Sequence, residues 1–346
     1  MKSCRRASCF PGMFAPAASA AHIGAPCTAL WQRRQSAAYP LDPARSQPAV
    51  RCHAASAVPS AHAADFRETA MHLELVSIVT EAEPLDGLFY RPAGEIKATA
   101  LLFHGNCHNF YTGPSRFLPA HLAEHGIASL AFNRRGHDMV TSLHGRTVGG
   151  GSFQLAREAI ADNRAASDWL AARGHRKPIV IGHSNGGMLA AQHCADDYGQ
   201  PRALVLMSAH VGGTENVPQM SRAGMFAQDR LEELTAQAEA MVARGAGREL
   251  MLLPDWWWVI SAESFLDRAR NTPSTVGNAP KVRCPSLYLR GDKELPESYP
   301  VEAFAAAAGA PCEARIIPDC DHFYTGREDN VGRQVVDWVV KTCKIG

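Results

Sequence analysis

The sequence predicts an α/β fold, in which a mainly parallel β-sheet is covered by helices on both faces. Short, continuous apolar runs such as residues 98–103 and 127–132 are typical of strands buried on both sides. Stretches with helical spacing separate these runs from residue 98 to 207. Strand–helix alternation of this kind favours parallel strands joined by crossover helices.

The regular pattern begins near Met71, after a leading stretch without periodicity. Residues 73–80 alternate apolar and polar side chains, and residues 85–90 follow an acidic turn, so the two predict a β-hairpin. The later elements are expected as strands at 98–103, 127–132, 178–181, 203–207, 286–290 and 314–317, and helices at 119–125, 153–173, 187–194 and 331–341.

The alternation stops between about residues 212 and 275. This segment has helical patterns at 229–243 and 256–270, and no convincing strand lies between them. We therefore expect one domain over residues 71–346, with a helical cap inserted at about 212–275.

Composition narrows the partners that this chain is suited to. It has 346 residues, 46% of them apolar, and a formal net charge of +1, so no strong field favours nucleic acid or an anionic membrane. This near-neutral net charge favours a small-molecule substrate and does not determine the oligomeric state. No apolar run reaches 18 residues, which excludes a transmembrane helix.

Residues 1–65 form a stretch rich in Ala, Ser and Pro with no hydrophobic period, and we expect it to be disordered. It could be a cleaved targeting segment, a flexible extension, or sequence upstream of a true start at Met71; the sequence favours the last two. The ten cysteines contain no C-x-x-C pair, which favours reduced thiols, a cytoplasmic location and no metal site. An organellar or exported location is expected only if residues 1–64 are a targeting segment.

The strongest local signal is Gly182-His183-Ser184-Asn185-Gly186, a G-x-S-x-G that follows a predicted strand and precedes a predicted helix. Small residues on either side allow a sharp turn that exposes the serine hydroxyl, and the helix N-terminus favours developing negative charge. We expect Ser184 to be a nucleophile. The alternative is an ordinary glycine turn in which Ser184 only caps the helix.

A serine nucleophile needs a histidine base and a carboxylate that orients the base. His193 lies nine residues along the same helix, about 13 Å away, whereas His322 follows the last predicted strand. We expect His322 to be the base. The carboxylate should follow the penultimate strand, where Glu294 is favoured over Asp292.

The oxyanion formed during acyl transfer requires two backbone N–H donors. Asn185, directly after the serine, is expected to supply one. The other is expected from the turn His104-Gly105-Asn106-Cys107 that follows an early strand, with Asn106 as the preferred donor.

Taken together, these motifs resemble the α/β-hydrolase superfamily, and the resemblance covers residues 71–346. The order of serine, acid and histidine is that of the superfamily. Asn133-Arg134-Arg135-Gly136 departs from its D-x-R-G segment at the first position, and Glu294 stands where Asp is more common. The resemblance implies an eight-stranded, mostly parallel sheet with one antiparallel strand, a cap over the site, and no cofactor.

Aromatic and histidine residues suggest where the substrate lies. Phe-Tyr-Thr-Gly occurs at residues 110–113 and again at 323–326, so Tyr111 and Tyr324 are expected at the mouth of the site; core packing is the alternative. His210 follows a strand near the same sheet edge. Trp257 belongs to a run of three tryptophans in the insertion, of which at least one should face the cleft.

These features predict a serine hydrolase that acts on carboxylic esters without a cofactor. Hydrolysis of an amide or carbon–carbon bond by the same residues is one alternative. A non-catalytic protein that binds small molecules is another, because one fold supports several functions.

Overall fold

The computed structural model of the chain describes residues 71–254 and 259–346. The predictions made for residues 1–65 and for Trp257 lie outside the described residues.

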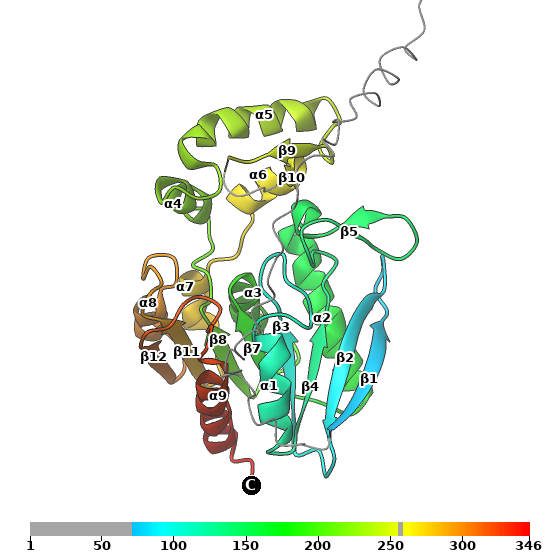
Figure 1. Cartoon of the computed structure of the whole chain (residues 1–346), viewed down its shortest axis with the longest axis vertical. Helices are drawn as coiled ribbons and strands as arrows, with labels where there is room; N and C mark the ends of the chain where they lie inside the picture. Colours follow the sequence, from blue (N-terminus) through cyan, green and yellow to red (C-terminus); the bar gives the residue numbers. More distant parts are fainter. Residues whose placement is uncertain (1–70, 255–258) are drawn as a thin grey trace, which may run out of the picture. The chain divides into compact units, whose positions relative to one another are not determined.

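Eight strands form one sheet at the centre of the described chain (Figure 1). They are β1 (Met71–Ile78), β2 (Leu85–Pro92), β3 (Ala98–Phe103), β4 (Ile127–Phe132), β7 (Ile179–His183), β8 (Ala203–Met207), β11 (Ser286–Gly291) and β12 (Cys312–Ile317). Across the sheet their order is β1-β2-β4-β3-β7-β8-β11-β12. Only β2 runs antiparallel to both of its neighbours, and every neighbouring pair from β4 to β12 is parallel. The predicted mostly parallel, eight-stranded sheet is therefore confirmed.

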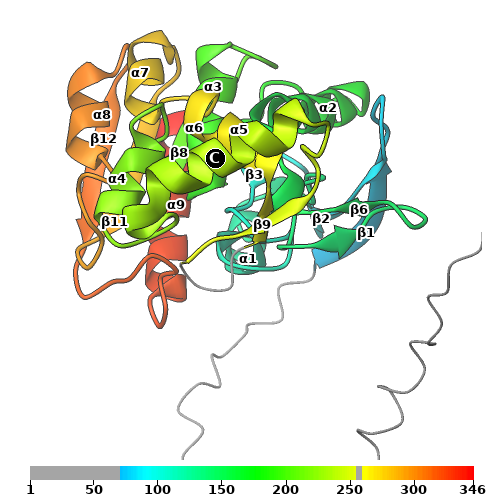
Figure 2. The ribbon, with the colours of Figure 1, turned by 90° about the horizontal axis from the view of Figure 1, so that it is seen from above.

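Helices cover both faces of the sheet (Figure 2). Leu101 and Phe103 of β3 pack with α2 (Ala156–Ala172), α3 (Asn185–Ala195) and α8 (Val301–Ala307). Ala100 and Leu102 point to the other face and pack with α1 (Pro114–Ala123) and α9 (Glu328–Cys343). Because both faces of the sheet are covered at its centre, the strands β3, β4, β7, β8 and β11 are buried throughout and their sequences are continuous apolar runs.

Between β8 and β11 the chain leaves the sheet and forms an insertion beyond the strand ends (Figures 1 and 2). The insertion has its own apolar cluster, which includes Phe226, Leu234, Met241 and Phe265. Its elements are α4 (Asn216–Arg222), α5 (Leu231–Ala243), β9 (Leu250–Leu252), β10 (Val259–Ser261) and α6 (Ala262–Arg270), and the short α7 (Thr275–Asn278) follows.

The prediction for residues 256–270 is wrong at its start. The helix begins only at Ala262, because residues 259–261 pair antiparallel with residues 250–252. The Ser261 side chain then accepts a hydrogen bond from the Ser264 backbone N–H at 3.1 Å, which caps α6. The insertion therefore contains a small hairpin as well as helices.

Helices α1 and α8 also differ from the sequence pattern. Helix α1 begins at Pro114 rather than residue 119, since proline is favoured in the first turn of a helix. Helix α8 was not predicted, because its alanine-rich sequence has no clear apolar period. Within the described residues, no helix has the length and apolar character needed to cross a bilayer.

Candidate active site

Ser184 occupies a strained turn between β7 and α3. Its backbone torsions are φ 54° and ψ −121°, a left-handed region that residues other than glycine rarely adopt. Neighbouring backbone groups hold it there. The Ser184 N–H donates to the Met207 carbonyl oxygen at 3.0 Å. The Ser184 carbonyl oxygen accepts from the His210 N–H at 3.1 Å.

The two outer glycines of the motif allow this turn to pack against the sheet. A Cβ at Gly182 would lie 2.3 Å from the Gly186 carbonyl oxygen, and one at Gly186 would lie 2.2 Å from the Phe103 carbonyl oxygen. Both clashes are with backbone atoms that cannot rotate away. The glycines are therefore required by close approach of the backbone, not by a positive φ.

Glu294, and not Asp292, contacts His322. The Glu294 Oε1 lies 2.6 Å from the His322 Nδ1, and its Oε2 accepts from the Gly291 N–H at 2.7 Å. Asp292 instead accepts the backbone N–H groups of Asp319 at 2.9 Å and Cys320 at 3.0 Å. These two bonds lower the pKa of the Asp292 carboxyl. Asp292 thus anchors the loop that carries His322, while Glu294 orients the imidazole.

Tyr324 and Ser208 form a chain of hydrogen bonds that ends at the Glu294 carboxylate. The Ser208 Oγ donates to Glu294 Oε2 at 2.6 Å, and the Tyr324 hydroxyl donates to Ser208 Oγ at 2.7 Å. Tyr324 is fully buried, and burial raises the pKa of its phenol well above the usual value. The expectation that Tyr324 lies at the mouth of the site is wrong, because its hydroxyl is used within the core.

His183 connects the serine turn to the histidine loop. Its Nε2 donates to the His322 carbonyl oxygen at 2.9 Å, and the two rings lie 4.7 Å apart. Burial lowers the pKa of His183 well below its usual value, so the ring is neutral. The residue immediately before Ser184 therefore fixes the backbone of His322, which brings both residues to one rim of the sheet.

The turn after β3 passes directly beside Ser184. A Cβ at Gly105 would lie 3.4 Å from the Ser184 Cβ. Buried Arg134 fixes this turn, since its Nη2 donates to the His104 carbonyl at 2.6 Å. Asn106 lies on this turn, and Asn185 is the first residue of α3, where backbone N–H groups have no acceptor within the helix.

The remaining predicted residues have different positions. Burial, and then the charges of His322 and Arg268, lower the pKa of His210 to about 3. The His210 ring contacts Tyr299, whose own ring lies 4.9 Å from that of His322. Tyr111 lies on the loop between the Asn106 turn and α1 and is 55% exposed. His210 therefore adjoins the His322 group, while Tyr111 lies on an exposed loop after the Asn106 turn.

A small pocket lies between Asn185 and the insertion. It is lined by Asn185, Met188 and Leu189 of α3, by Gln154 and Ala156 before and at the start of α2, and by Asn216, Asp267, Arg268 and Thr272 of the insertion. Arg268 also donates through Nη2 to the Asn106 side-chain oxygen at 3.0 Å. The sequence pattern assigns no role to His183, although it lies in the serine motif, and gives no signal for Arg268, Ser208 or Tyr299.

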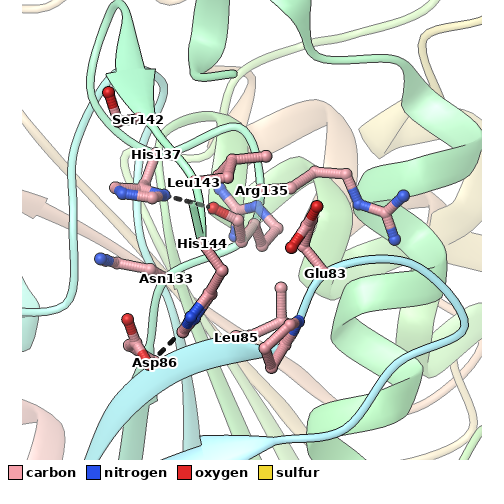
Figure 3. Close-up of a pocket in the computed structure, with 11 residues that line it drawn as sticks. Glu83, Leu85, Asp86, Asn133, Arg135, His137, Ser142, Leu143 and His144 are labelled. Carbon is pink, nitrogen blue, oxygen red and sulfur yellow. Dashed lines mark hydrogen bonds and ion pairs between the residues drawn. The ribbon is translucent and has the colours of Figure 1, made fainter. Parts of the chain in front are cut away.

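A second pocket lies beside the β1–β2 turn and the hairpin of β5 (Thr141–Ser142) and β6 (Val148–Gly149). Figure 3 shows that Glu83, Asp86, Arg135 and His144 line it, with His144 paired to Asp86 at 3.5 Å. Its lining includes none of Ser184, Glu294 and His322. Among the described residues, no group of three or more His, Cys, Asp or Glu side chains is placed to hold a metal ion.

A family model for the alpha/beta hydrolase family matches residues 100–334, which is more than half of the chain. The chain belongs to the alpha/beta hydrolase family. The match covers the turn after β3, the Ser184 turn, Glu294 and His322, so the predicted resemblance is confirmed.

Solved structures with the same fold include several esterases and a lipase. Est1E from Butyrivibrio proteoclasticus is 16% identical, with 78% of this chain and 99% of that chain covered and a TM-score of 0.58. An esterase of Pyrococcus furiosus is 17% identical, with 80% and 92% covered and a TM-score of 0.55. A soluble variant of monoglyceride lipase from Saccharomyces cerevisiae is 14% identical, with 78% and 96% covered and a TM-score of 0.55. A search of curated proteins finds no match to this member of the alpha/beta hydrolase family.

Proposed function

We propose that this protein is a cofactor-independent serine hydrolase that cleaves carboxylic esters through an acyl-enzyme. The observation that carries the proposal is the link between the Ser184 turn and the His322–Glu294 pair: His183, next to Ser184, bonds the His322 carbonyl at 2.9 Å. A strained serine beside an oriented imidazole is the arrangement that activates a hydroxyl for acyl transfer.

Each group has a defined part in the reaction. The Nδ1–H of His322 donates to Glu294, which leaves Nε2 unprotonated and able to accept the Ser184 proton. The Ser184 Oγ attacks the acyl carbon, and the carbonyl oxygen becomes an oxyanion held by the backbone N–H groups of Asn106 and Asn185. The intermediate collapses, and the alcohol leaves with the proton from the imidazolium.

Water then repeats these steps on the acyl-enzyme. His322 takes a proton from the water, the resulting hydroxide attacks the acyl carbon, and Ser184 leaves with the proton as the acid is released. In this proposal the insertion at about residues 212–275 acts as a cap, which limits the access of water and bulky substrates. The hydrogen bonds from Arg268 to Asn106 and from Ala156 to Asp267 support that position.

Labelling with a fluorophosphonate tests the nucleophile. We expect rapid labelling of Ser184, loss of labelling in Ser184→Ala, and slow labelling in His322→Gln, whereas His125→Gln, a change at an exposed histidine, leaves the rate unchanged. Absence of labelling in the folded wild type would contradict the proposal and favour a non-catalytic binding protein.

A substrate panel tests the bond that is cleaved. We expect turnover of p-nitrophenyl esters of short chain length and slower or no turnover of the matching anilides. Labelling of Ser184 together with turnover of anilides but not esters would instead indicate an amidase. A labelled enzyme inactive on both would favour the carbon–carbon bond alternative.

A further inference from the structure

Arg290 is a buried cation near the end of β11, four residues before Glu294. Its side chain is only 6% exposed. It lies on the same face of the sheet as Tyr288, two residues earlier, whose ring packs against Phe304 of α8. Because a guanidinium loses hydration when it is buried, its hydrogen bonds must replace the lost contacts with water. The partners of Arg290 therefore indicate what this charge is used for.

Arg290 bonds both ends of the segment 294–302. Its Nη1 donates to the backbone carbonyl oxygen of Glu294 at 3.0 Å, and its Nη2 donates to Oε1 of Glu302 in the first turn of α8, also at 3.0 Å. A guanidinium can make both bonds at once because its donors are fixed in one plane. One side chain thus joins the residue that bonds His322 to the start of the next helix.

The segment 294–302 brings two groups against His322. The Glu294 Oε1 lies 2.6 Å from the His322 Nδ1, and the centre of the Tyr299 ring lies 4.9 Å from that of the His322 ring. Both groups belong to the part of the chain that Arg290 bonds at its two ends. A shift of this segment would therefore displace both contacts of the imidazole together.

The carboxylate of Glu294 and its backbone are held by different residues. Gly291 and Ser208 both donate to Oε2, at 2.7 and 2.6 Å. Several rotatable bonds separate that carboxylate from the backbone, so these two bonds do not by themselves fix the Glu294 main chain. The bond from Arg290 to the Glu294 carbonyl oxygen supplies this restraint.

Stability gives a weak reason for an arginine at this position. The Nε of Arg290 is buried and has no hydrogen-bond partner among the described residues, and a buried donor without a partner costs free energy. The Glu302 side chain is 62% exposed, and an ion pair with an exposed partner contributes little. A packed apolar side chain is often as stable as a buried ion pair. The geometry of its two bonds is therefore the property that distinguishes Arg290.

We propose that Arg290 is a positioning residue, which holds the segment 294–302 so that Glu294 and Tyr299 keep their contacts with His322. This inference rests on the proposed function and adds to it a residue that acts through Glu294 rather than on the substrate. The two donors matter more than the charge. Lysine, whose ammonium is a single point charge on a flexible chain, should replace arginine only in part.

The kinetics of p-nitrophenyl acetate hydrolysis test this role. We expect Arg290→Met to lower kcat by about 10- to 100-fold with little change in KM, because small misplacements of catalytic groups have effects of this size. Arg290→Lys should retain an intermediate kcat. Arg315→Met is the matched control, since Arg315 on the neighbouring strand β12 also bonds a carboxylate, that of Glu313 at 2.8 Å, and a backbone carbonyl, that of Gln334 at 3.1 Å. We expect this control to keep the wild-type kcat.

Proton NMR measures the bond that Arg290 is proposed to maintain, without any turnover. A proton in a short, charge-assisted hydrogen bond resonates far downfield, and the His322 Nδ1–H should give such a signal, which is absent in His322→Gln. We expect the signal to move upfield or broaden in Arg290→Met and to stay unchanged in Arg315→Met. A purely structural role would lower the stability to urea and leave both the signal and kcat unchanged.

Should Arg290→Met not fold, Glu302→Ala decides the question, because the Glu302 side chain is exposed and its loss leaves the Nη2 donor of Arg290 without this partner. We expect a loss of about 3- to 10-fold in kcat, the size of one hydrogen bond, and a change of the NMR signal in the same direction.

Wild-type kcat in folded Arg290→Met, or an equal loss in Arg315→Met, would overturn the inference. Wild-type kcat and signal in Glu302→Ala would do the same where that variant decides. Each of these results leaves the proposed function standing, because the wild type is still labelled at Ser184 and still hydrolyses esters. Failure of fluorophosphonate to label Ser184, with no ester hydrolysed, would refute the proposed function itself.

Discussion

Several residues of the proposed nucleophile's surroundings have strained backbone torsions. Cys107, Ser184, Ser208 and Tyr324 all have φ between 44° and 61° although none is glycine. Such torsions persist only where the surroundings impose them, and they are common at functional sites. Here they accompany the sharp turn at Ser184 and the hydrogen bonds that link Tyr324 and Ser208 to Glu294.

The two carboxylates after β11 should differ sharply when each is replaced by its amide. Glu294→Gln keeps the shape but removes the charge that stabilises the imidazolium, so kcat should fall by about 10³- to 10⁴-fold. Asp292→Asn should change kcat less than about tenfold and lower stability, because it weakens the bonds to Asp319 and Cys320. Ester kinetics and urea unfolding of both variants measure this. Equal effects on kcat would contradict the assignment.

His183 should act as a positioning residue through its Nε2–H. Glutamine can place an N–H near the same point, so His183→Gln should retain kcat within about tenfold, whereas His183→Phe should lower kcat by about 10- to 100-fold with little change in KM. The kcat–pH profile should shift in His183→Phe alone. If both variants match the wild type in kcat and pH profile, the link to His322 has no catalytic role.

At the scale of single residues, the sequence points to residues that lie in local motifs or directly after predicted strands. Ser184 and His322 follow strands in recognisable segments. Ser208, Tyr299 and Arg268 come from segments with no local signal, and only the folded chain brings them to the site. For Tyr324 the repeated tetrapeptide predicts either a place at the mouth of the site or core packing, because it does not reveal which way the side chain points, and the buried position found is the second of these.

Among the elements, the close packing of α3 on β3 depends on glycine. Gly186→Ala places a Cβ 2.2 Å from the Phe103 carbonyl oxygen, and we expect a loss of roughly 2–4 kcal/mol in the free energy of unfolding. Gly94→Ala is the control, since no atom lies within 4 Å of its Cβ, and it should change stability by less than about 1 kcal/mol. Urea unfolding measures both; similar stabilities would contradict the packing.

The central strands β3, β4, β7, β8 and β11 were predictable because both of their faces are buried, which leaves a continuous apolar run in the sequence. The insertion was harder to predict. Its hairpin strands have only three residues each, too few to show a period, and the paired residues 250–252 and 259–261 look like parts of neighbouring helices. The local sequence pattern alone therefore could not distinguish a short hairpin from the ends of two neighbouring helices.

The whole molecule contains several buried neutral histidines, which should make it sensitive to acid. Burial lowers the pKa of His193 to about 4, below the value of about 6.5 in the unfolded chain. The unfolded state therefore binds more protons between these values. The stability from this group is complete above about pH 6.5 and is lost as the pH falls, by up to about 3 kcal/mol near pH 4.

Urea unfolding between pH 7 and pH 4.5 tests this effect. His193→Gln removes the titrating group, so its stability should depend less steeply on pH than that of the wild type, even if it is lower at pH 7. A variant slope as steep as the wild-type slope would show that His193 does not contribute.

The proposed reaction of the whole molecule requires Ser184 to carry the acyl group during turnover. Rapid-quench mass spectrometry during hydrolysis of p-nitrophenyl acetate tests this most directly. We predict one acetyl group on the peptide that contains Ser184, formed as p-nitrophenol is released and lost on hydrolysis, with none in Ser184→Ala. Turnover without acetylated Ser184, or undiminished turnover by Ser184→Ala, would contradict it.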